Sequence, residues 1–274
     1  MKAEPKEKEE LTLEVLDADG KPIRTFSNLK DEEGAPESSG EGEGFGPPPS
    51  MRKLPAKAGS NRFVWDLRYP DAKRFNGMIL WSAEMRGPVA VPGNYQVRLK
   101  AGGKTLTQPL DLRPDPRLET SAADYRKQFD LQMKIRDKVS EAHEAIARIR
   151  GVREQVTAAV DRAKGNPDEK GIEEAGDAFK KKLTAVEEAL YQTKNQSNQD
   201  PLNFPIRLNN KLASLAGVVG SAAAAPTDQS YAVYEDLTTK IDAELQTLRT
   251  VLDKDLPAFN QLVRDKNVLA VKVP

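Results

Sequence analysis

Side chains that could carry chemistry are few and widely spaced in this chain. His143 is the only histidine, and there is no cysteine. A zinc site around His143 would need mostly carboxylate ligands, which is unusual. We therefore predict no metal site and no cofactor, and we interpret His143 as a surface or packing residue of a long helix.

Three short patterns resemble ligand-binding motifs, but their surroundings do not fit. Residues 17–20 read Asp-Ala-Asp-Gly, like the start of a calcium loop that lacks its later ligands. Residues 103–105 read Gly-Lys-Thr, like the end of a P-loop, but Arg98 stands where that loop needs glycine. The glycines at 40–46 do not have the spacing of a dinucleotide-binding loop. Because no serine has a nucleophile-elbow context either, we expect no catalytic residue and no enzyme activity in this chain.

The two tryptophans are the remaining candidates for a ligand site. Trp65 lies in the alternating segment 62–69, which predicts a strand with Phe63, Trp65 and Leu67 on one face. That pattern favours a buried ring. Trp81 follows an apolar run beside an expected loop, so its ring has the better chance of being exposed. If an aromatic ring here is a platform for a ligand such as a sugar, we expect Trp81 first and Trp65 second.

Composition limits the partners that this chain can be expected to bind. It has 274 residues, a length typical of two domains. Its 42 basic and 42 acidic residues balance, which gives no electrostatic reason to expect nucleic acid or an anionic membrane as partner. No apolar run approaches the roughly 20 residues that span a bilayer, and residues 1–10 lack the apolar core of a signal peptide.

Residues 1–113 show short strands separated by turns. Leu11, Leu13 and Val15 alternate with more polar residues, and the sequence at 17–20 predicts a hairpin turn after them. A second hairpin is predicted at residues 102–103, where two glycines separate two alternating segments. We predict an immunoglobulin-like β-sandwich that lacks an edge strand, with a Gly/Pro/Glu-rich loop at 27–60.

Residues 114–274 show long amphipathic helices. A stripe that begins at Ile135 predicts a first helix of about 40 residues, with Ser121 and Asp124 as its capping box. Gly165 predicts its end, and Asn166 is the expected N-cap of the second helix.

Two further apolar stripes, which begin at Leu208 and Tyr234, predict a third and a fourth helix. Thr227 is the expected N-cap of the fourth helix. Pro257 is expected to interrupt the last helix, and residues 268–274 could form a terminal strand or an extended strap. We predict an antiparallel helical bundle over 114–274 with a C-terminal extension, so the fold class is α+β with two domains. A dimeric coiled coil is the open alternative.

Four longer strings are more distinctive than any motif. They are NRFVWDLRYPDAKRFNGMILW at 61–81, RGPVAVPGNYQVRL at 86–99, DPLNFPIRLNNKLASLAGVV at 200–219 and APTDQSYAVYEDL at 225–237. Together they resemble the C-terminal region of bacterial sortilin-like, BNR-repeat, glycosyl-hydrolase-like proteins. In that family an immunoglobulin-like domain and a helical segment follow a β-propeller. The chain contains no propeller and no Asp-box, so the resemblance places any hydrolase chemistry outside these residues, and it implies a secreted, periplasmic or cell-surface location.

These patterns predict a non-catalytic, C-terminal interaction or scaffold module. Its expected partners are the parent propeller, another envelope protein, or a second copy bound through the helices. The alternative is a carbohydrate-binding accessory module that uses Trp81 or Trp65.

Overall fold

A computed structural model gives the fold of this chain. It describes all residues except 2, 7, 31–52, 166, 269–270 and 272–274. The chain forms two compact units, each assembled from three segments. The unit that we call the sheet unit comprises Met1–Ala72, Met85–Arg136 and Val219–Thr227, and the helical unit comprises Lys73–Glu84, Asp137–Val218 and Asp228–Pro274. The division into 1–113 and 114–274 stays a prediction, and segments from both sides of residue 113 contribute to each unit.

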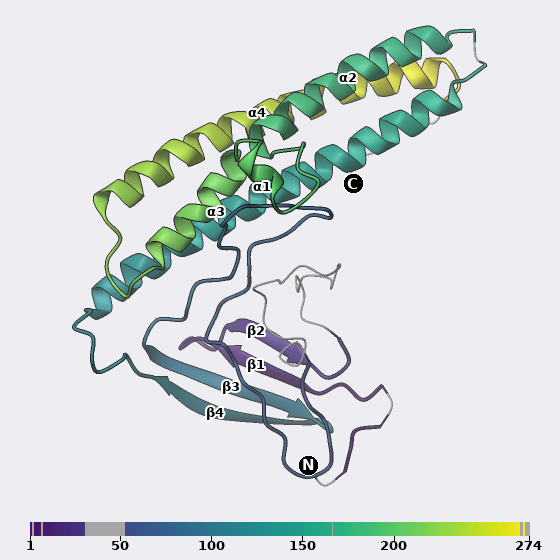
Figure 1. Cartoon of the computed structure of the whole chain (residues 1–274). Coiled ribbons are helices and arrows are strands. Elements are labelled where there is room, and N and C mark those ends of the chain that lie inside the picture. The colour runs from purple at the N-terminus through teal and green to yellow at the C-terminus, as the bar shows by residue number, and fades with distance from the viewer. Residues whose placement is uncertain (2, 7, 31–52, 166, 269–270, 272–274) are drawn as a thin grey trace. The chain divides into compact units, whose positions relative to one another are not determined.

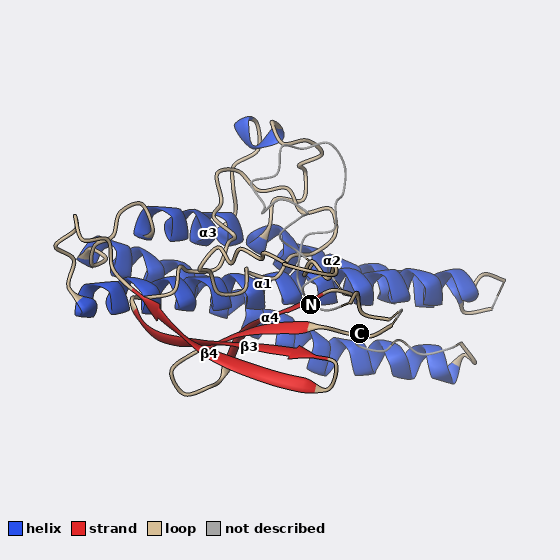
Figure 2. Cartoon of the chain, turned by 90° about the horizontal axis from the view of Figure 1, so that it is seen from below, coloured by secondary structure: helices blue, strands red, loops and turns tan. Residues whose placement is uncertain are grey.

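The sheet unit contains an antiparallel sheet of four described strands. They are β1 (Thr12–Leu16), β2 (Pro22–Ser27), β3 (Gly93–Ala101) and β4 (Lys104–Leu112), in the order β2-β1-β3-β4 (Figure 1). Figure 2 shows the strands in red and the helices in blue. One face carries a core of Leu11, Val15, Phe26 and Leu54. The mixed α+β class is therefore present, with one sheet among the described residues where the predicted sandwich has two.

Both predicted hairpins are confirmed. β1 pairs with β2 around the turn at 17–20, where Gly20 has φ +80° and Asp17 accepts hydrogen bonds from the N–H groups of Asp19 (3.1 Å) and Lys21 (2.8 Å). β3 pairs with β4 around Gly102 and Gly103, which have φ +56° and +71°. Left-handed backbone at both central residues suits glycine and matches the twist of the strands.

The predicted strand at 62–69 is wrong. These residues form no strand, and only Arg68 makes a single bridge, to Val89. Leu67 has φ +61°, which breaks the extended backbone. The predicted inward side chains still reach the core, because Phe63 packs on Phe26 with ring centroids 4.6 Å apart. The alternation therefore indicated burial correctly, whereas the backbone takes an irregular path.

Most of the helical unit consists of four described α-helices (Figure 1). They are α1 (Ala122–Arg162), α2 (Glu169–Leu190), α3 (Leu208–Val219) and α4 (Asp228–Asp265), and a short 3-10 turn, η2, covers Asp200–Leu202. The first part of α1, to Arg136, belongs to the sheet unit. Ser121 caps α1, because its Oγ accepts the N–H of Asp124 at 3.1 Å. The length and cap of α1 are thus confirmed. Three other expectations concern residues outside the described ones, namely the N-cap Asn166, residues 31–52 of the loop 27–60 and most of 268–274.

Contacts fix the directions of the long helices. The pairs are Arg150 with Glu187 and Val160 with Gly176 for α1 and α2, and Lys182 with Asp255 and Phe179 with Phe259 for α2 and α4. Because α2 is antiparallel to both α1 and α4, these two run parallel. This differs from the expected up-and-down order of four helices. α2 runs toward the N-terminal end of α1, and Asn209 of α3 contacts His143, which lies nearer that end than Arg150, the partner of Glu187 in α2. The 191–207 connection therefore continues in the direction of α2, whereas a hairpin would reverse it.

Pro257 does not interrupt the last helix, which is a second correction. α4 continues through it to Asp265. Leu256, Phe259 and Val263 around the proline are buried, so packing offsets the hydrogen bond that proline cannot donate. Further on, the Asn260 side chain holds Val271 by both backbone groups, accepting its N–H (2.6 Å) and donating to its carbonyl (2.8 Å).

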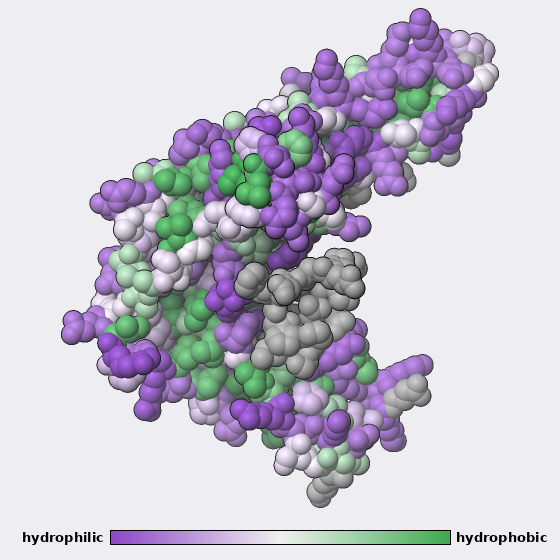
Figure 3. Space-filling view, in the orientation of Figure 1, coloured by the Kyte–Doolittle hydropathy of each residue, from purple (hydrophilic) through white to green (hydrophobic). Residues whose placement is uncertain are grey.

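The visible surface of the helices is mainly hydrophilic, with small apolar patches (Figure 3). Their apolar stripes are largely buried, as Ile135, Ile146, Leu183 and Ile241 show. No helix within the described residues is long and apolar enough to cross a membrane.

Candidate functional site

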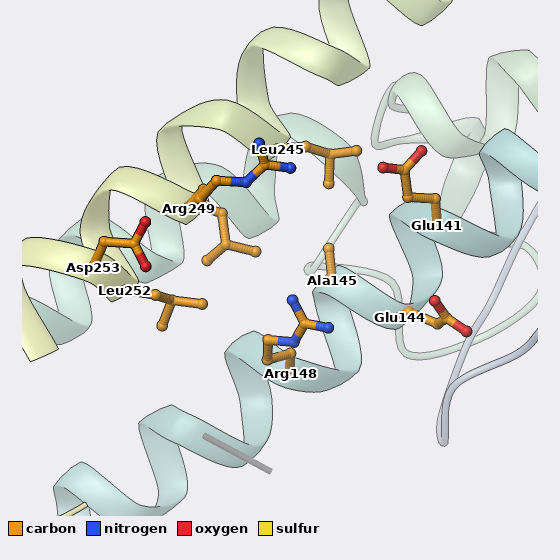
Figure 4. A pocket seen from close by; sticks show the side chains of 9 residues that line it. Glu141, Glu144, Ala145, Arg148, Leu245, Arg249, Leu252 and Asp253 are labelled. Carbon is orange, nitrogen blue, oxygen red and sulfur yellow. The ribbon is translucent and has the colours of Figure 1, made fainter. Parts of the chain in front are cut away.

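A groove between α1 and α4 is a concave site among the described residues of the helical unit. Its volume is about 350 Å³. Ala145 on α1 and Leu245, Leu248 and Leu252 on α4 supply its apolar surface (Figure 4). Charged side chains surround them, namely Glu141, Glu144, Arg148, Arg249 and Asp253. Most of the surface that lines the groove is polar, and the leucines form a smaller apolar patch within it. An apolar centre with a polar rim is the usual anatomy of a surface that binds a polypeptide.

The apolar stripe of α4 explains why the groove exists. Ile241 and Leu248 are buried, whereas Leu245 and Leu252 on the same stripe are only half-buried. α2 packs against α4 on one side, and on the other side the small Ala145 of α1 cannot reach across to cover these leucines. The stripe is therefore wider than the neighbouring helices can bury.

The rim charges differ in how well they are satisfied. Lys138 pairs with Glu141 at 2.6 Å, and Lys73 pairs with Glu144. Arg249 has only a long contact of 3.4 Å with the side-chain oxygen of Gln246. Arg148 and Asp253 have no ion pair or hydrogen bond to any described residue. Two opposite charges thus remain available to a partner at this groove.

The predicted platform Trp81 belongs to an irregular segment, residues 73–84, of the helical unit. Trp81 as a whole residue is 37% exposed. Its backbone is fixed by one side chain, because Asn210 Oδ1 accepts the Trp81 N–H at 2.7 Å and Asn210 Nδ2 donates to the Trp81 carbonyl at 2.7 Å. Trp81 is therefore exposed on a fixed backbone, and its role as a platform stays a prediction.

Trp65, the second predicted platform, lies in the sheet unit. It is half-buried beside Tyr95, with ring centroids 6.3 Å apart, and its Nε1 donates to the Arg68 carbonyl at 3.0 Å. Packing on the core and a satisfied polar atom favour the buried ring that the alternation indicated, and the role of Trp65 as a platform stays a prediction. The two tryptophans belong to different units.

Side chains of α1 and of the residue that follows α2 hold the rest of segment 73–84 by its backbone. Ser140 Oγ accepts the Lys73 N–H at 3.0 Å, and Tyr191 Oη accepts the Ile79 N–H at 3.0 Å. Phe75 inserts its ring between His143 and Tyr191 at centroid distances of 5.2 and 5.0 Å. These contacts give an irregular segment the backbone partners that a strand would supply.

His143 is fully buried and serves this segment. Its Nδ1 lies 2.6 Å from the Lys73 carbonyl, so Nδ1 carries the proton, and Nε2 accepts from Asn209 Nδ2 at 3.0 Å. Burial, helped by the charge of Arg74, lowers the pKa of His143 from 6.5 to about 4 despite the carbonyl contact. The neutral imidazole packs and forms hydrogen bonds inside the helical unit. Of the two expected positions of His143, on the surface or in the packed interior, the structure shows the second.

A buried carboxylate joins α1 to α2. Glu187 is 1% exposed and lies 2.6 Å from Arg150 Nε and 2.7 Å from Arg153 Nη1. Two arginines on one carboxylate offset the cost of burying its charge. Sequence reasoning missed Glu187, Asn209 and Asn210; the paired asparagines inside an apolar helix stripe were the available signal for the last two.

Within the described residues no group of three or more acidic or histidine side chains could hold a metal ion. Comparisons with protein-family models, curated proteins and solved structures gave no match.

Proposed function

We propose that this chain is a non-catalytic interaction module that binds another polypeptide in the groove between α1 and α4. The observation that carries the proposal is the combination of half-buried leucines with an unpaired Arg148 and an unpaired Asp253 around them. Apolar surface supplies binding free energy, and flanking charges select and orient the partner. Glu141 and Glu144 are already held by lysines, which favours a docking role for this rim over acid–base chemistry.

The sequence resemblance supplies the proposed context. A module of this kind would follow a β-propeller in a secreted or envelope-located protein, and its partner would be the propeller, another envelope protein or a second copy of the chain. In this proposal the sheet unit is an immunoglobulin-like β-structure that provides a rigid surface, while the helices provide the docking face.

Site-specific photo-crosslinking tests the proposal. Benzoylphenylalanine in place of Leu252 puts an apolar crosslinker in the groove, and the same residue in place of the exposed Lys181 on α2 is the matched control. In cells of the producing organism we expect polypeptide adducts from position 252 and none from position 181. An absence of adducts at position 252, with the protein folded by circular dichroism, would contradict a docking role for the groove.

A further inference from the structure

The charges around the groove alternate in a regular way. Lys138 of α1 pairs with Asp242 of the parallel helix α4 at 2.6 Å. This pair fixes the axial register of the two helices, and we call residues at the same height along the two axes level with each other. Further along, Glu144 therefore lies level with Arg249. One helical turn later, Arg148 lies level with Asp253. At each level the two helices carry opposite charges, and from one level to the next the signs exchange.

This arrangement is complementary to itself. Consider a two-fold axis that runs parallel to the helices in front of the groove. Rotation by 180° about it places α1 of one copy against α4 of the other, and each residue keeps its height along the helix axes. Arg148 would then meet Asp253 of the partner subunit, and Glu144 would meet Arg249 of the partner subunit. Each contact occurs twice, because a two-fold interface is built from the same patch on both copies.

We propose that the occupant of the groove is a second copy of this chain, bound about a two-fold axis parallel to α1 and α4. This inference rests on the proposed docking function and names its partner. Leu245 and Leu252 of the two copies would form the apolar centre, with the ion pairs at its edge. The charge pattern specifies a parallel arrangement, because the antiparallel one puts α1 against α1 and leaves Arg148 and Asp253 of different copies apart.

Unpaired charges at a half-exposed groove argue for this occupant. Arg148 and Asp253 belong to one chain and lie on opposite sides of the groove (Figure 4), without bonding to each other or to any other described residue. A second copy satisfies both with the charges that the chain already has. A partner of another sequence would have to reproduce the same alternation of charges.

Charge reversal with sedimentation velocity of the full chain tests this inference. We expect a monomer–dimer equilibrium that weakens as salt is raised. R148E and D253R should each raise the dimer dissociation constant at least about tenfold, because each reversal acts at two contacts. The double variant R148E/D253R recreates the pairs with exchanged signs and should return the constant to within about threefold of wild type.

The control is K181E, which changes the net charge as R148E does but lies on the exposed part of α2. It should leave the dissociation constant unchanged. Three results would overturn the proposed dimer. The chain could stay monomeric at all concentrations, the double variant could dimerise no more tightly than the single variants, or K181E could weaken the dimer as much as R148E. If position 252 then still crosslinks to a different protein, the docking function survives and only the choice of partner is wrong.

Discussion

His143 connects acidity to the stability of the helical unit. Its imidazole is neutral in the folded chain, because Nε2 accepts from Asn209 and burial lowers its pKa to about 4, against 6.5 for the exposed group. The unfolded chain therefore takes up the proton first as pH falls. The stability due to neutral His143 is complete above pH 6.5 and is lost progressively between 6.5 and 4.

Over that window we expect His143 to reduce the free energy of unfolding by about 3 kcal/mol. Urea unfolding at neutral pH and near pH 4 measures the loss in wild type and in His143→Gln. We expect the glutamine variant to be less stable at neutral pH but to lose less on acidification, because it has no imidazole to protonate. The carboxylates titrate in both proteins, so their contribution cancels in the comparison. Equal losses in the two proteins would show that His143 is not the group responsible.

The sequence could not specify the partners of these residues. A lone histidine on a helix is compatible with a surface or a buried position, and it is Lys73, 70 residues earlier, that accepts its hydrogen bond. Asn210 bonds to Trp81 over 129 residues. Pairs so distant depend on the complete fold, so the exposure of Trp81 and the fixation of its backbone became clear only from the structure.

At the scale of elements, two glycines of α2 have opposite roles. A Cβ atom at Gly176 would lie 2.7 Å from Val160 Cγ2 and 3.6 Å from a ring carbon of Phe259. A Cβ atom at Gly171 would meet nothing within 4 Å. Gly176 therefore permits the close approach of α2 to its neighbours, whereas Gly171 only lowers the helix propensity.

The same substitution should act with opposite sign at these positions. We expect Gly171→Ala to stabilise the chain by about 0.5 kcal/mol through helix propensity. Gly176→Ala gains the same term but forces Val160 to move, and we expect a net loss of about 1 kcal/mol. Urea unfolding monitored by circular dichroism gives both values. A gain at both positions would mean that the helices do not pack closely at Gly176.

Local signals predicted the elements where local physics decides them. The turn at 17–20 and the Gly102–Gly103 hairpin need left-handed backbone, which the glycines permit, and Ser121 caps α1 as its spacing indicated. The failures at 62–69 and at Pro257 have one cause. Tertiary packing supports an irregular segment in the first case and a helix through proline in the second, against the local preference.

At the scale of the whole molecule, the two units are interleaved along the chain. Segment 73–84 belongs to the helical unit, although the residues before and after it belong to the sheet unit. The sequence showed a change of pattern near residue 113, because strand and helix periodicities differ there. It gave no sign that a short irregular segment within the strand-rich half completes the helical unit.

Helix α1 is shared between the units, which should couple their unfolding. Residues up to Arg136 belong to the sheet unit and those from Asp137 belong to the helical unit. Phe129 and Leu131 are buried in the first part, and Val139 and Ile146 are buried in the second. If the helical unit unfolds, only a helix of about 15 residues remains for the sheet unit, a length that is marginal without its continuation.

We therefore expect both units to unfold in one cooperative transition. Each unit has one tryptophan, so Trp81→Phe leaves Trp65 as a fluorescent reporter of the sheet unit, while far-UV circular dichroism reports mainly the helices. The two signals should give the same urea midpoint. Lys134→Pro in this variant breaks α1 near the boundary, at a cost of about 3 kcal/mol, and should separate the midpoints. Separate midpoints already without the proline would mean that the shared helix does not couple the two units.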